Sequence, residues 1–301
     1  MLNQIGSVSM LSTSFGTNAT RKSNRLRVFT AASVLVFLSL SPACKGKEED
    51  PAQVQQLIVK MIEEGENKRV NFKLVAAEKR FRDALDLDPQ CSAALCGIGE
   101  IRLEQKNYAE AENFLSQAIA ADPNNAQAHA AIGKLHAANE KFEQSAEAYG
   151  KAYALKSDNS LWALEYGTAL RKANRLGEAE KILRKVAEDD PKVQYVFSEL
   201  GDTLRLQKKF DEALKVYMQA QNTYASDKAA RAGAALIYES KGETTLAINE
   251  WSDYIRMDCC STYSNSVAKP KIASLRAIES GETPAAPAED SAENQARQAQ
   301  K

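Results

Sequence analysis

A repeat of 34 residues constrains the fold of this chain more than any other feature of its sequence. Six rows of that length, the first starting at Ile58, align without a gap and span residues 58–261. The eighth and twentieth columns hold small residues: Gly65, Gly99, Gly133, Gly167, Gly201 and Ala235 in the one, and Ala77, Ala111, Ser145, Ala179, Ala213 and Ala247 in the other. The twenty-fourth column holds large apolar residues: Phe81, Leu115, Tyr149, Leu183, Tyr217 and Trp251.

These columns predict a pair of antiparallel helices in every row. Small residues at columns eight and twenty let the two helices approach closely, and the large residue at column twenty-four fills the groove between them. Proline cannot continue a helix because it lacks the N–H group, and Pro89, Pro123 and Pro191 follow the second helix of three rows. Before the first row, Asp50 and Pro51 offer an N-cap and a first-turn proline to the opening helix.

The columns resemble those of the tetratricopeptide repeat. The resemblance implies an all-α fold, a right-handed solenoid of six helix-turn-helix repeats over residues 58–261. We expect a capping helix within residues 262–280, where 266–279 carries apolar residues that can cover the last repeat. Residues 281–301 are rich in Pro, Ala and charge, and we expect them to be disordered. In the first row the segment KRVNFKLVAA departs from the pattern, as expected of a capping repeat.

The first 43 residues read as an export signal. A cationic segment at 21–27 precedes thirteen uncharged residues from Val28 to Leu40. Thirteen helical residues rise only about 20 Å, too short for the roughly 30 Å core of a bilayer, so this pattern indicates a secretory signal peptide. Either Met1 or Met10 can serve as its start.

The end of this leader, Ser41-Pro42-Ala43-Cys44, resembles a bacterial lipobox. The resemblance implies a lipid on Cys44, no other cofactor, and a short linker within residues 44–57 that leads into the first helix. Lys45 in the next position implies an outer-membrane anchor with the protein facing the periplasm. Lipoboxes prefer Leu where Ser41 stands, so a soluble periplasmic protein released by ordinary signal cleavage stays open.

Composition and charge narrow the classes of function. With 14 Gly and 8 Pro in 301 residues, the chain is typical of a soluble helical protein and unlike a collagen. The net charge is -1, and removing a leader with four cations and no acid brings it to -5. A mildly acidic chain offers little to a phosphate backbone, so we expect no nucleic-acid partner.

The sequence holds no recognisable catalytic or metal-binding motif, and we expect no enzyme activity and no bound metal. Its two histidines, His129 and His136, lie seven residues apart on one helix and are interpreted as core residues. The remaining cysteines are Cys91, Cys96, Cys259 and Cys260. Only the neighbours in each pair are close enough to bridge, with strained geometry, so we expect free thiols while leaving their redox state open.

In the tetratricopeptide family the first helix of each repeat lines a concave groove. In this chain the groove-facing columns of the fourth and fifth rows hold eight candidate binding residues: Leu161, Leu164, Thr168, Arg171, Tyr195, Ser198, Asp202 and Arg205. Leu161, Leu164 and Tyr195 would anchor a partner segment by apolar contact. Arg171 and Arg205 would steer an acidic ligand or simply form a solvated helix face. The cationic clamp of the chaperone-binding members is absent from these columns.

Together these features predict a membrane-anchored scaffold that binds envelope proteins in the periplasm. Lipoproteins of this construction resemble the pilotins that help to assemble type IV pilus secretins. Two alternatives stay open: an adaptor that recruits peptidoglycan hydrolases or synthases, and a structural envelope protein that uses its convex face. The identity of the partner and a homodimer also stay open.

Overall fold

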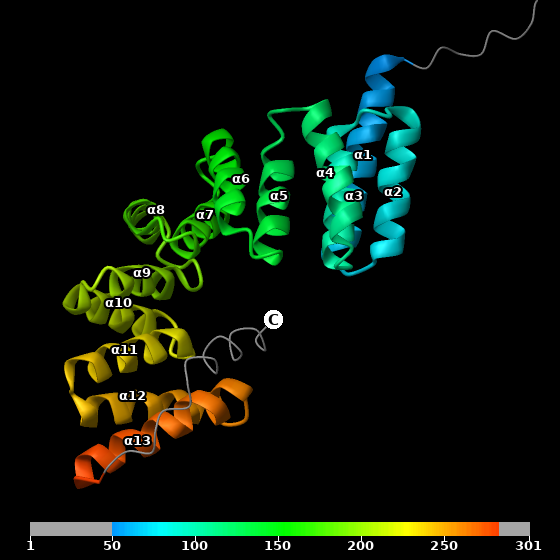
Figure 1. The fold of residues 1–301 in the computed structure, drawn as a ribbon. Coiled ribbons are helices and arrows are strands. Elements are labelled where there is room, and N and C mark those ends of the chain that lie inside the picture. The colour runs from blue at the N-terminus through cyan, green and yellow to red at the C-terminus, as the bar shows by residue number, and fades with distance from the viewer. Residues whose placement is uncertain (1–49, 283–301) are drawn as a thin grey trace, which may run out of the picture. The chain divides into compact units, whose positions relative to one another are not determined.

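The computed structural model describes residues 50–282, which form helices and no strands (Figure 1). The predicted signal peptide, Cys44 and nearly all of the predicted disordered tail lie outside this range. Its helices are α1 Pro51–Val70, α2 Leu74–Leu87, α3 Ser92–Glu104, α4 Tyr108–Ala121, α5 Ala126–Ala138, α6 Phe142–Leu155, α7 Ser160–Lys172, α8 Leu176–Asp189, α9 Val196–Leu206, α10 Phe210–Thr223, α11 Lys228–Lys241, α12 Thr244–Met257, a π-helical segment η1 Ser264–Ala268, and α13 Lys269–Ser280.

The helices form six antiparallel pairs in the predicted register. From α4 to α12 the second helix of each pair begins 34 residues after the previous one, at Tyr108, Phe142, Leu176, Phe210 and Thr244. Each helix packs against the next helix in sequence, and first helices also contact the first helix of a neighbouring pair, as α1 does with α3 and α9 does with α11. The predicted all-α solenoid of six repeats is confirmed. None of the described helices combines the length and apolarity needed to cross a bilayer.

Close contact between the two helices of a pair depends on glycine at column eight. A Cβ atom added to Gly65 would lie 2.6 Å from the Phe81 ring, and one added to Gly133 would lie 2.6 Å from the Tyr149 ring. Phe81 is fully buried, and Tyr149 is 4% exposed. The role predicted for columns eight and twenty-four is therefore confirmed: the small residue makes room for the large one.

Each of the six pairs turns in the same way between its two helices. The residue at column fifteen has a positive φ, and it is Phe72, Lys106, Glu140, Asn174, Lys208 or Gly242. The backbone N–H of the next residue donates a hydrogen bond to a carbonyl of the first helix. For example, the Lys73 N–H donates to the Lys68 carbonyl at 2.9 Å, and the Lys209 N–H donates to the Leu204 carbonyl at 2.9 Å. These bonds satisfy carbonyls that the end of a helix leaves open.

The start of α9 departs from the pattern. Asn125, Asn159 and Asp227 cap α5, α7 and α11 through their side-chain oxygens. The equivalent residue before the fifth row is Val193, and valine cannot cap. As a result α9 begins only at Val196, and Tyr195 lies before the helix with a left-handed φ of 69°. The expectation that Tyr195 lies on the first helix of its repeat was wrong.

The last pair is covered as predicted. The η1 segment and α13 pack on α12, with Val267, Ile272 and Leu275 buried. Trp251 is fully buried, and its ring centroid lies 5.9 Å from that of Tyr254 and 6.3 Å from that of Tyr263. The predicted capping helix is therefore present, and an aromatic cluster joins it to the sixth repeat.

The first pair is longer than the others. Helix α1 starts seven residues ahead of the first row, and Asp50 caps it by accepting from the Ala52 N–H at 3.1 Å. Pro51 stands in its first turn, where a missing N–H has no consequence. The cap and the first-turn proline predicted from the sequence are confirmed.

Candidate protein-binding surface

The candidate groove residues of α7 divide into exposed and buried positions. Leu161 is 64% exposed and is available to a partner, whereas Leu164 is 8% exposed and belongs to the main core cluster. Thr168 is half-buried. Stacking of successive helix pairs thus places Leu164 in the core rather than on an open groove surface, and its predicted role as a partner anchor stays a prediction.

The same stacking removes other columns from the groove. Gly97 and Gly233, at column six, face the rings of Phe81 and Tyr217 from the preceding repeat so closely that neither position has room for a side chain. Cys96, Ala130 and Ala131 are also buried. In the second and third rows, columns five and six therefore serve in contacts between repeats.

Ser198 has a structural role. It is 3% exposed, and its hydroxyl donates to the Asp227 carboxylate. Asp227 is equally buried and caps α11 by accepting from the Ala230 N–H at 3.1 Å. Ser198 therefore joins α9 to the start of α11, and its predicted contact with a partner stays a prediction.

Arg171 forms an ion pair between repeats. Its Nη2 lies 2.8 Å from Glu199 Oε2, and its side chain is 14% exposed. Burial lowers the pKa of Arg171, but the charges of Glu199 and Asp202 together with the hydrogen bond to Glu199 raise it overall. Arg171 is thus neither a free charge for an acidic ligand nor part of a solvated face.

Asp202 and Arg205 belong to a second polar contact on α9. Asp202 Oδ1 accepts from the Tyr217 hydroxyl at 2.7 Å and lies 3.3 Å from Arg205 Nη2. Burial and the nearby Asp202 carboxylate both raise the pKa of Tyr217, which keeps its hydroxyl protonated as a donor. Arg205 therefore has a fixed carboxylate partner within its own helix.

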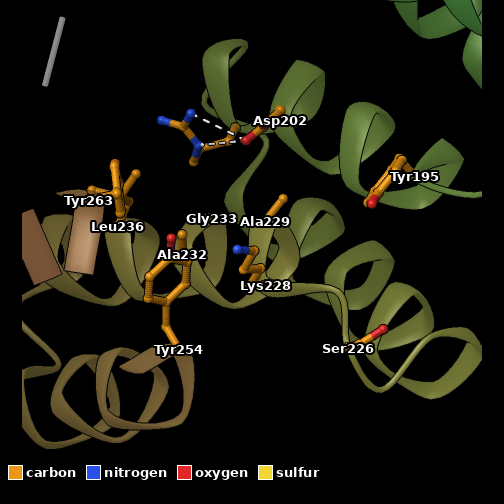
Figure 2. Close-up of a pocket in the computed structure, with 11 residues that line it drawn as sticks. Tyr195, Asp202, Ser226, Lys228, Ala229, Ala232, Gly233, Leu236, Tyr254 and Tyr263 are labelled. Carbon is orange, nitrogen blue, oxygen red and sulfur yellow. Dashed lines mark hydrogen bonds and ion pairs between the residues drawn. The ribbon is translucent and has the colours of Figure 1, made fainter. Parts of the chain in front are cut away.

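Three of the eight candidates meet at a shallow hollow of ≈ 260 Å³ (Figure 2). Tyr195, Asp202 and Arg205 line one side of it, and the other sides come from α11, from α12 and from the segment before η1. The lining residues are Tyr195, Asp202, Arg205, Ser226, Lys228, Ala229, Ala232, Gly233, Leu236, Tyr254 and Tyr263. Figure 2 draws the ion pair of Asp202 as dashed lines, with Tyr195 standing apart from it.

The hollow has tyrosines around a floor of small residues, and its two cations are already paired. Lys228 forms an ion pair with Asp258, as Arg205 does with Asp202. Burial, with a further contribution from Asp258, raises the pKa of Tyr254 to about 12, so its hydroxyl stays neutral. Tyrosine offers an apolar ring and one hydrogen-bonding hydroxyl. The hollow is therefore suited to an uncharged or amphipathic segment of a protein.

The sequence revealed only part of this hollow. Ala229, Ala232 and Gly233 follow from the groove columns of the sixth row, but Lys228, Leu236, Tyr254 and Tyr263 were not predicted. One available signal was overlooked. Column twenty-seven holds a small residue or valine in five rows and Tyr254 in the sixth, which indicates a different neighbour there.

The remaining candidate groups fit a structural role. His129 is buried, and its Nε2 lies 2.9 Å from the Pro123 carbonyl, so its interpretation as a core residue is confirmed. Burial lowers the pKa of His136. Within residues 50–282, no three His, Cys, Asp or Glu side chains gather as metal ligands would. Cys96 is a buried free thiol, and Cys259 and Cys260 are exposed free thiols.

Comparison with known families decides what the helix pairs are. Residues 71–135 and 136–198 each match the family described as tetratricopeptide repeat. Residues 71–198 are therefore similar to tetratricopeptide repeats. The matched residues include the turn after α1 and reach the start of α9, and the gapless register carries the same geometry on to α12.

Among curated proteins the similarity is confined to part of each chain. A TPR repeat-containing protein of Dictyostelium discoideum is 28% identical over 111 residues, which are 35% of this chain and 42% of that protein. The cell division cycle protein 16 homolog of Mus musculus is 29% identical over 132 residues, which are 41% of this chain and 19% of that protein. This chain therefore matches less than half the length of either relative.

Solved structures share the fold at low sequence identity. PilF of Pseudomonas aeruginosa superposes with a TM-score of 0.61 and 15% identity, covering 71% of this chain and 97% of that one. YrrB, described as a TPR protein with an unusual peptide-binding site, gives a TM-score of 0.54 and 17% identity, covering 63% and 97%. At these identities the comparison concerns the fold alone.

Proposed function

We propose that this protein is a scaffold of the bacterial envelope that binds a segment of a partner protein in the tyrosine-lined hollow. The observation that carries the proposal is the hollow itself. It is formed by two repeats and the cap, its floor of Ala229, Ala232 and Gly233 lets a backbone approach closely, and its tyrosines can contact an amphipathic segment. The proposed role is non-enzymatic and needs no cofactor.

The proposed location depends on the lipid expected at Cys44. A lipid anchor would hold the scaffold at the outer membrane and raise the local concentration of its bound partner there. Labelled palmitate should enter the full-length protein and should not enter Cys44→Ser. Equal labelling of both proteins would contradict the anchor and leave a soluble periplasmic scaffold.

The proposed process is the assembly of type IV pilus secretins. It is supported by the combination of a lipobox-like leader with six tetratricopeptide repeats, and by a fold like that of PilF. Recruitment of peptidoglycan hydrolases or synthases is the second candidate, because an adaptor would use the same hollow. A structural role of the convex face is the third.

In vivo photo-cross-linking tests the hollow directly. A photoreactive residue in place of Tyr195, which is 50% exposed, should capture a partner, and one in place of Met218, which is 62% exposed on α10 outside the hollow, should not. Adding Ala229→Glu should abolish capture by the photoreactive residue at position 195, because it places a carboxylate on the floor of the hollow. Capture from both positions, or capture that survives Ala229→Glu, would contradict the hollow as the binding site.

A second pair of variants tests whether the partner binds at the hollow or in the middle of the array. Leu161→Glu changes an exposed residue of α7 and tests the middle, whereas Leu164→Glu would bury a charge and unfold the repeat. Loss of the partner in Leu161→Glu alone would move the binding site to α7. The captured protein identifies the process: a secretin or pilus subunit supports pilus assembly, and a cell-wall enzyme supports the adaptor.

A further inference from the structure

The turn between α1 and α2 exposes more apolar surface than any other described turn of its kind. We call residues 70–75 the Phe72 turn. Val70 is 68% exposed, Phe72 is 85% exposed and Val75 is 86% exposed. Three large apolar side chains within six residues thus protrude into solvent at one end of the first helix pair.

The same position in the other repeats shows that the turn geometry does not require them. Column fifteen has a positive φ in all six pairs, and the other five residues there are Lys106, Glu140, Asn174, Lys208 and Gly242. A bulky aromatic residue is an outlier at such a φ, which is 57° for Phe72. The exposed ring is therefore held in an unfavourable backbone conformation, and the fold gains no core contact from it.

The turn also carries basic residues. Lys68 and Arg69 stand in the last turn of α1, and Lys73 follows Phe72 directly. The first turn of α2 holds no acidic residue, whereas those of α4, α6, α8 and α10 each hold at least one. Arg69 is paired with Glu66, Glu100 and Glu104, and Lys68 lies 3.8 Å from Glu64. Lys73 is exposed directly beside the apolar tip.

We propose that the Phe72 turn inserts into the interface of an anionic phospholipid bilayer. An aromatic ring with flanking lysines is favoured at the boundary between headgroups and acyl chains, where the ring leaves water and the ammonium groups meet lipid phosphates. A convex tip is suited to a deformable surface, because it needs no matching pocket. The first turn of α2 holds no acid, which removes a repulsion that the turns before α4, α6, α8 and α10 would meet.

Such a contact would orient the array. Helix α1 has 20 residues and is therefore about 30 Å long, and the proposed lipid anchor precedes it. An anchor before its first residue and an insertion after its last would lay α1 along the bilayer. The insertion itself does not depend on Cys44, so it can be tested without the lipid.

Vesicle binding of residues 49–301, which include every described helix, tests the proposal. This chain should co-sediment with vesicles of phosphatidylethanolamine and phosphatidylglycerol and bind weakly to phosphatidylcholine vesicles. Phe72→Gly should lower binding about tenfold, because burying a Phe ring provides much of the affinity of a small insertion. Glycine accepts the positive φ, so this variant keeps the fold and should melt no lower than the wild type. Met218→Ser, at an exposed apolar residue of α10, is the matched control and should bind normally.

A fluorescence measurement reports the position of the side chain. In Phe72→Trp, anionic vesicles should shift the emission of the added indole to shorter wavelength, as read from the difference from the wild-type spectrum. Equal binding by the wild type and Phe72→Gly would overturn the proposal, as would an unshifted emission of the added indole. If neither chain binds vesicles and a photoreactive residue at position 72 captures an envelope protein, the turn docks on a protein and the proposal is wrong.

Discussion

The first and the last helix pair build their cores in the same way but differ on the sides that face away from the array. In both, a small residue on the first helix packs under a fully buried aromatic: Gly65 under Phe81, and Ala235 opposite Trp251. Beyond the last pair, η1 and α13 cover Trp251 and Tyr254. Beyond the first pair, Val59 of α1 and Phe72 remain exposed.

This difference follows from how a repeat protein is stabilised. Each pair packs only on its neighbours, so an interior pair has two apolar sides covered, and each terminal pair needs a substitute for the missing neighbour. The C-terminal end has one in the capping helix. Among the described residues the N-terminal end has no equivalent cover, and Val59 and Phe72 are exposed there.

The largest expected effect is at the covered end. Trp251→Ala should lower the free energy of unfolding by about 3–5 kcal/mol, because it removes the ring that joins α12 to the cap and leaves a cavity. Its counterpart at the open end, Phe72→Ala, should change stability by less than about 0.5 kcal/mol. Urea denaturation followed by helical signal checks both. Equal losses would mean that the exposed Phe72 supports the fold, so that the two ends would not differ as their burial indicates.

A smaller loss of stability is expected from a change to the packing that both terminal pairs share, a small residue against a buried aromatic. Gly65→Ala places a methyl group 2.6 Å from the Phe81 ring and should cost about 1–3 kcal/mol by overpacking. The control is Gly177→Ala in α8, where nothing lies within 4 Å of the added atom and where about 0.5–1 kcal/mol of stabilisation is expected. Thermal melts of both variants would show whether the first pair is packed as tightly as the interior pairs. A tolerated Gly65→Ala would mean that it is not.

The regular part of the fold could be predicted because its causes recur every 34 residues. Gly133 and Tyr149, or Gly167 and Leu183, show the same close approach in one row after another, and the sequence alone reveals this periodicity. The capping helix could also be predicted, since 266–279 is amphipathic and follows the last row directly. The polar turns conform to one geometry for the same reason.

The surface was harder to predict, because it depends on how neighbouring rows meet. Leu164 was expected to line the groove, and stacking of the next pair buries it. Arg171 was expected to be free or solvated, but Glu199 of the next repeat pairs with it. Tyr195 was expected on a helix, and a missing cap at Val193 delays that helix. The first row was interpreted as a capping repeat, whereas Phe72 shows that its unusual segment is exposed.

The smallest expected effect is a difference in pH response between the ends. Near the first pair, burial raises the pKa of Glu100 above its ordinary value of 4.5, although Arg69 opposes the shift. Glu100 then holds its proton more tightly in the folded state than in the unfolded one. Stability from this group is present at low pH and is lost as the pH rises from 4.5 through the folded pKa.

At the last pair the sign is reversed. The hydrogen bond from Lys228 lowers the pKa of Asp258 below its ordinary value of 3.8, so the stability that it provides is present above that pH and is lost as the pH falls through the folded pKa. Glu100→Gln should therefore be more stable than the wild type between about pH 4.5 and 7. Asp258→Asn should be less stable than the wild type above about pH 4 and equally stable below it. Hydrogen exchange at several pH values, compared between α3 and α12, measures both effects. Parallel pH responses at the two helices would show that the ends are not independent, because a cooperative array transmits local destabilisation along its length.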